Sequence, residues 1–75
     1  MASFATVIKQ LRKERGLTQD QLAALLGVSR STIGMYETGS REPDFETSEA
    51  IADVFNVDMD YLMGRSNVER QFPVT

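Results

Sequence analysis

A chain of 75 residues is long enough for one small domain with a single core, and at this size a dimer or another partner often adds stability. It contains no Cys and no His, which excludes disulfide bonds, thiolate or imidazole metal sites and catalysis by Cys or His. We therefore expect no enzyme, and no metal, cofactor or small-molecule ligand. The net charge of −3 at first sight disfavours nucleic acid as a partner.

The charges, however, are divided unevenly along the chain. Residues 1–41 carry six Lys and Arg against three Asp and Glu, whereas residues 42–75 carry two against eight. The acidic half has two interpretations: a solvated face that keeps the protein soluble, or a surface for a basic partner. No stretch approaches the roughly 20 apolar residues of a membrane span, and the N-terminus lacks an export signal, so we expect a cytoplasmic protein without membrane contact.

The first predicted helix runs from about Phe4 to Arg15, with Ser3 as its N-cap. Apolar residues recur at helical spacing along one of its faces: Phe4, Val7, Ile8 and Leu11. Gly16 follows as the residue that can adopt the left-handed conformation after a helix. This helix should bury one face against the rest of the domain.

Two short helical patterns then lie on either side of a turn at Gly27, within residues 17–39. The earlier one begins with a capping box formed by Thr18 and Gln21, and the later one, about Arg30 to Thr38, begins after a Ser29 cap. Small Ala23 lets the two helices approach where they cross, and Ile33 and Tyr36 should face the core. The pattern predicts a helix-turn-helix whose outward residues are short and polar, as suits a helix in the major groove of DNA.

Gly34 lies in the middle of the later helix, where glycine costs about 1 kcal/mol relative to Ala. Either it lets the backbone approach DNA or a neighbour closely, or it is tolerated at an exposed position.

Asp44 caps a fourth predicted helix, from Phe45 to about Phe55. Its inner face should comprise Phe45, Ile51, Ala52 and Phe55, with Ser48 at the edge. Asp58 caps a last short helix, Met59 to Met63, which Gly64 ends. Helical periodicity is absent from residues 65–75, which we expect to form a flexible tail or the start of a linker.

Leu17 to Gly39, followed by REPD at 41–44 and NVDMDYLMG at 56–64, resembles the Cro/C1-type (XRE family) helix-turn-helix domain of phage and prophage repressors. The resemblance covers residues 4–64. It implies an all-α, lambda-repressor-like domain of five helices at residues 1–64, with the helix-turn-helix formed by helices 2 and 3. It also implies pairing into dimers and entry of the third helix into the major groove of double-stranded DNA.

The resemblance also implies roles for individual residues. Base contacts fall to Ser29, Arg30, Ser31 and Met35. Phosphate contacts fall to Thr18, Gln19, Thr32, Thr38 and Arg41. Arg12 and Glu37 match a structural ion pair between the first and third helices. Arg30 is the strongest candidate for specificity, because a guanidinium can bond O6 and N7 of guanine together, and Met35 could contact a thymine methyl group.

We expect a sequence-specific DNA-binding transcriptional regulator, a repressor that binds an inverted-repeat operator as a homodimer. Four residues are candidates for the dimer contact, with core packing as the alternative for them: Met59, Tyr61, Met63 and Phe72. A second hypothesis keeps the fold but makes the chain a protein-interaction module, such as an antitoxin or antirepressor, whose acidic half binds a basic partner. The chain could be a short stand-alone regulator or the DNA-binding part of a longer repressor, and the sequence leaves both open.

Overall fold

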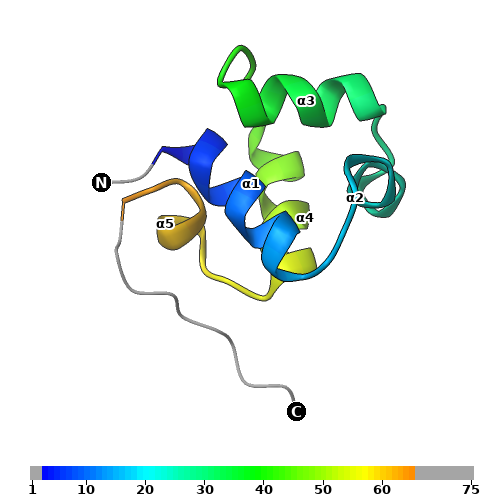
Figure 1. Ribbon diagram of the computed structural model, residues 1–75. Helices are drawn as coiled ribbons and strands as arrows, with labels where there is room; N and C mark the ends of the chain where they lie inside the picture. The colour runs from blue at the N-terminus through cyan, green and yellow to red at the C-terminus, as the bar shows by residue number, and fades with distance from the viewer. Residues whose placement is uncertain (1–2, 66–75) are drawn as a thin grey trace.

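The computed structural model describes residues 3–65, which form five α-helices (Figure 1). They are α1 Phe4–Glu14, α2 Gln19–Leu26, α3 Arg30–Thr38, α4 Phe45–Phe55 and α5 Met59–Leu62. The predicted all-α class and the five helices are confirmed. Helices α1 and α5 each end one residue earlier than predicted.

Every helix begins at a residue whose side-chain oxygen accepts a hydrogen bond from the backbone N–H three positions later: Ser3, Thr18, Ser29, Asp44 and Asp58. At α2 the capping box is complete, because the Gln21 N–H donates to Thr18 Oγ1 at 3.0 Å and the Thr18 N–H donates to Gln21 Oε1 at 2.8 Å. Gly27, with φ of 71°, ends α2 and turns the chain into α3. Short-range chemistry therefore sets where the helices begin.

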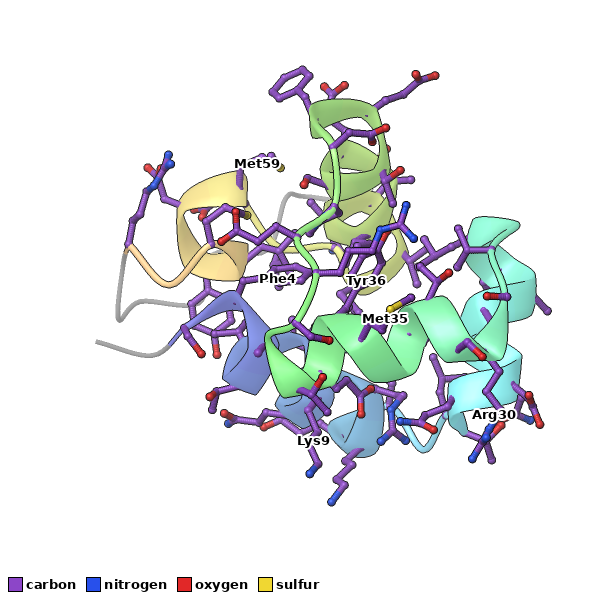
Figure 2. All side chains as sticks on the ribbon, turned by 90° about the horizontal axis from the view of Figure 1, so that it is seen from above. Phe4, Lys9, Arg30, Met35, Tyr36 and Met59 are labelled. Atoms are coloured by element: carbon purple, nitrogen blue, oxygen red, sulfur yellow. The ribbon has the colours of Figure 1, made fainter. Side chains whose placement is uncertain are left out.

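All five helices contribute buried side chains to the core. In Figure 1, α3 runs across the top of the molecule and α2 is seen nearly end-on beside the start of α3. Helix α1 packs against α3 and α5, and α2 packs against α3 and α4. The rings of Phe4 and Tyr36 meet edge to face, with centroids 5.9 Å apart, and join α1 to α3 (Figure 2). The buried apolar side chains are Phe4, Val7, Ile8, Leu11, Leu22, Ala23, Ile33, Tyr36, Ile51, Ala52, Phe55, Val57 and Leu62.

The prediction for the inner face of α4 was wrong at its first residue. Phe45 is 71% exposed, whereas Ser48, expected only at the edge of that face, is 3% exposed. Phe45 begins α4 and projects beyond the core, and the helix register that buries Ile51 and Phe55 turns Ser48 inward. Within residues 3–65, no buried side-chain nitrogen or oxygen lacks a hydrogen-bond partner, so burial of this serine strands no polar atom.

The predicted tail begins at Arg65, whose N–H donates to the Asp60 carbonyl at 2.8 Å beyond the end of α5. The rest of that tail, including Phe72, lies outside the described residues. Among residues 3–65 no helix is long and apolar enough to cross a bilayer.

Candidate nucleic-acid interface

Helix α3 presents a short, mainly polar face outward. Ile33 and Tyr36 are buried, and the opposite side of the helix carries Ser31, Met35 and Thr38. Ser31 and Thr38 are exposed and Met35 is half-buried. Figure 2 looks down on this helix, with Arg30 at its start and Met35 farther along. Because this face has few bulky side chains, α3 could approach the base edges in the major groove of DNA, which is about 12 Å wide.

The N-cap and first turn of α3 hold four of the predicted contact residues: Ser29, Arg30, Ser31 and Thr32. The Ser29 hydroxyl accepts from the Thr32 N–H at 3.1 Å and lies 2.9 Å from the Thr32 hydroxyl, so both hydroxyls are engaged within the turn. The Arg30 side chain is 66% exposed, and its Nε lies 3.8 Å from Asp20 Oδ1 on α2. Arg30 is therefore exposed beside the start of α2.

The start of α2 provides two more predicted contacts. The Thr18 hydroxyl serves as the N-cap, and Gln19 is the first residue of the helix. Gln19 is half-buried, and its Nε2 donates to Glu37 Oε1 at 3.1 Å. A primary amide has two N–H groups, so Gln19 can donate one hydrogen bond to Glu37 and a second to an anion at the positive end of α2.

Arg12 and Glu37 are paired at the edge of α3. Arg12 Nη2 donates to Glu37 Oε1 at 3.0 Å, Arg12 Nε donates to the other carboxylate oxygen, and Nη1 donates to the Leu17 carbonyl at 2.9 Å. The side chains of Arg12 and Glu37 are 11% and 4% exposed. This pair joins α1 to α3, and through Gln19 it reaches α2 as well.

The same contacts shift the pKa values of both partners. The hydrogen bond to Glu37 raises the pKa of Arg12 against the opposing effect of burial. Burial pushes the pKa of Glu37 upward, but the hydrogen bonds from Arg12 and Gln19, together with the charges of Arg12 and Lys9, outweigh it and lower the pKa overall. Glu37 is therefore held as a carboxylate although it is buried.

The segment after α3 carries the remaining predicted contacts. The Thr38 hydroxyl donates to the Met35 carbonyl at 3.2 Å, and the Arg41 N–H donates to the same carbonyl at 3.3 Å. The Arg41 side chain is exposed. It lines a groove of about 600 Å³ with Ser29 and Thr32 on α3, and the acidic residues Glu42 and Asp44 line that groove too.

Three of the residues predicted for a dimer contact lie in α5 or directly after it: Met59, Tyr61 and Met63. Each is half-buried and packs against the core, so core packing accounts for part of their surface. Their role in a dimer stays a prediction, and the fourth candidate, Phe72, lies outside the described residues.

Sequence reasoning missed two features of this surface. One is the approach of Asp20 to Arg30, which opposite charges at the starts of two crossing helices could have indicated. The other is the pair of exposed lysines, Lys9 and Lys13, which lie one turn apart on α1 and line an open groove with Glu37. Among residues 3–65, no group of three or more Asp and Glu side chains could hold a metal ion.

Comparison with known proteins identifies relatives along most of the chain. A sequence profile described as helix-turn-helix matches residues 8–62. The chain is 39% identical over 69 residues to the uncharacterized HTH-type transcriptional regulator YqaE of Bacillus subtilis, covering 92% of this chain and 60% of that protein. It is 36% identical over 63 residues to the cryptic phage CTXphi transcriptional repressor RstR of Vibrio cholerae, covering 84% of this chain and 57% of that protein.

Among solved structures, the P22 c2 repressor protein in complex with synthetic operator 9T has a similar fold. The TM-score is 0.82 at 26% sequence identity, over 88% of this chain and 100% of that chain. The chain thus covers the whole of that repressor chain, but only between about half and three fifths of the length of three curated Bacillus subtilis regulators that it matches.

Proposed function

The chain belongs to the XRE-type helix-turn-helix family, and we propose that it acts as a sequence-specific DNA-binding transcriptional repressor without catalytic activity. The observation that carries the proposal is the exposed polar face of α3, with the start of α2 on one side and Arg41 on the other. Two relatives support it, because one is named a transcriptional repressor and the other is a repressor in complex with a synthetic operator.

In the proposed complex α3 lies in the major groove. The guanidinium of Arg30 bonds O6 and N7 of a guanine, the hydroxyls of Ser29 and Ser31 bond base edges, and Met35 contacts a thymine methyl group. Phosphates flank the helix on both sides: Thr18 and Gln19 bind one strand, and Thr32, Thr38 and Arg41 bind the other. The positive end of α2 adds to the attraction for the first strand.

The proposed assembly is a homodimer on an inverted repeat. Two copies of α3 about 34 Å apart would read half-sites one helical turn apart, with Met59, Tyr61, Met63 and Phe72 as candidates for the contact between copies. Occupying an operator would block access to a promoter, and we expect such a regulator to act in the cytoplasm.

The variant Arg30→Ala tests the proposal. Loss of one bidentate contact should reduce discrimination between operator and random duplex by about 1–3 kcal/mol per half-site and leave weak general binding intact. Arg41→Ala is the matched control, since loss of a phosphate contact should weaken binding to both duplexes alike and make the slope of log affinity against log salt shallower by about 1 per half-site. Equal losses on both duplexes for Arg30→Ala would show that Arg30 reads no base.

A protein-interaction module is the second candidate function. Phe45 is 71% exposed at the start of α4, beside exposed Glu46 and Glu49, a combination that suits a basic partner. Absence of binding to any duplex at low salt would favour this function over the repressor.

A further inference from the structure

Asp20 and Arg30 lie close together at the starts of the two crossing helices. Asp20 is the second residue of α2 and Arg30 the first residue of α3, with Oδ1 and Nε 3.8 Å apart. Their side chains are 76% and 66% exposed, so both face the solvent where DNA would bind. Arg30 projects beside the start of α2 in Figure 2.

An acid at this position is costly for a DNA-binding surface, because it repels the phosphates that Gln19, the preceding residue, is proposed to bind. Glu37 is also an acid at this surface, but it is buried and bonded to Arg12 and Gln19. Asp20 has no comparable structural task, since Thr18 already caps α2 and the carboxylate is exposed. As an acidic residue in the first turn, Asp20 interacts favourably with the positive end of α2.

We propose that Asp20 is a positioning residue that increases base specificity through Arg30, an inference that rests on the proposed function. The carboxylate attracts Nε, on the side of the planar guanidinium, and leaves Nη1 and Nη2 at the far end for O6 and N7 of guanine. Arginine has many rotamers, so holding it beside Asp20 reduces the entropy that is lost when it binds the base.

The same carboxylate disfavours other DNA. When Arg30 turns aside to a phosphate, Asp20 loses its partner and stays close to the negatively charged backbone. Asp20 therefore weakens binding to random duplex more than binding to the operator.

A double-mutant cycle with Asp20→Asn and Arg30→Ala tests this inference, with affinity for the operator and for random duplex measured at several salt concentrations. Exposed ion pairs shift equilibria by up to about fivefold. We expect Asp20→Asn to raise affinity for random duplex and to lower the ratio of operator to random affinity about threefold per half-site. In the Arg30→Ala background the ratio should not change further.

Asp53→Asn, which removes one exposed charge on α4, is the matched control and should leave the ratio unchanged. An equal gain on both duplexes for Asp20→Asn would overturn the inference and make Asp20 a general repulsive charge. The inference would also be overturned if Asp20→Asn still lowered the ratio of operator to random affinity in the Arg30→Ala background. If the wild-type protein binds no duplex, both the proposed function and this inference fail. If it binds the operator but Asp20→Asn leaves the ratio unchanged, only the inference fails.

Discussion

Replacing Glu37 by Ala removes the group that joins three helices at the edge of α3. The carboxylate accepts two hydrogen bonds from Arg12 and one from Gln19, and without it the guanidinium of Arg12 keeps its bond to the Leu17 carbonyl in a site where the side chain is 11% exposed. The variant therefore leaves a nearly buried positive charge without its counter-ion.

Breaking a buried ion pair by removing one partner costs about 3–5 kcal/mol. Glu37 borders the open groove that Lys9 and Lys13 line, so water can reach the stranded charge, and we expect a cost near the lower end, about 3 kcal/mol. A domain of this length has a free energy of unfolding of about 4–11 kcal/mol, so the loss takes a large part of it. The corresponding fall in Tm is about 12–24 °C.

Thermal and urea unfolding, followed by circular dichroism, would measure this cost for Glu37→Ala, Arg12→Ala and the double variant. Because Arg12 and Glu37 are bonded to each other, the double variant should be less destabilised than the sum of the single variants, by at least about 1 kcal/mol. A loss below about 0.5 kcal/mol for Glu37→Ala, or additive losses in the cycle, would refute the stabilising role of the pair.

Two other predictions concern stability. Apart from its neighbours in α3, a Cβ at Gly34 would meet no atom of the described residues within 4 Å. Gly34→Ala should therefore raise the free energy of unfolding by about 0.5–1 kcal/mol in chemical denaturation, and an unchanged or lower value would contradict this. If DNA affinity falls in the same variant, the backbone at Gly34 approaches DNA. The pKa of Glu37 is lower in the folded state than in the unfolded chain, where it is about 4.3. As pH falls below about 4.3, the unfolded chain therefore binds a proton at Glu37 before the folded chain does. The contribution of the pair to the free energy of unfolding is complete above that pH and is lost as pH falls through the folded-state pKa. Acid titration of Tm should show a smaller decrease in Glu37→Gln than in the wild type, and identical profiles would exclude the linkage.

Helix boundaries were predictable because their signals lie within a few residues of each other. Thr18 and Gln21 cap α2 across three positions, and Gly27 supplies the left-handed residue that ends it. The burial of Ser48 and the exposure of Phe45 depend instead on where α4 meets the other helices, which spacing within one helix does not determine.

The candidate site, too, was predictable from the sequence only in part. The short polar character of α3 could be recognised from residues 29–38 alone, but the pairing of Arg12 with Glu37 came from the family resemblance and not from spacing. The contacts of Gln19 with Glu37 and of Asp20 with Arg30 join residues that are 18 and 10 positions apart, and they depend on how α2 and α3 cross. Contacts between surface side chains where two helices cross could therefore not be predicted from the sequence of either helix alone.

Selection of bound sites from random duplex DNA tests the central claim most directly. A dimer that reads bases with α3 should enrich an inverted repeat whose half-sites lie about 34 Å apart, one helical turn, with a guanine in each half-site whose enrichment disappears in Arg30→Ala. Recovery of sequences without symmetry or base preference would contradict sequence-specific binding through α3.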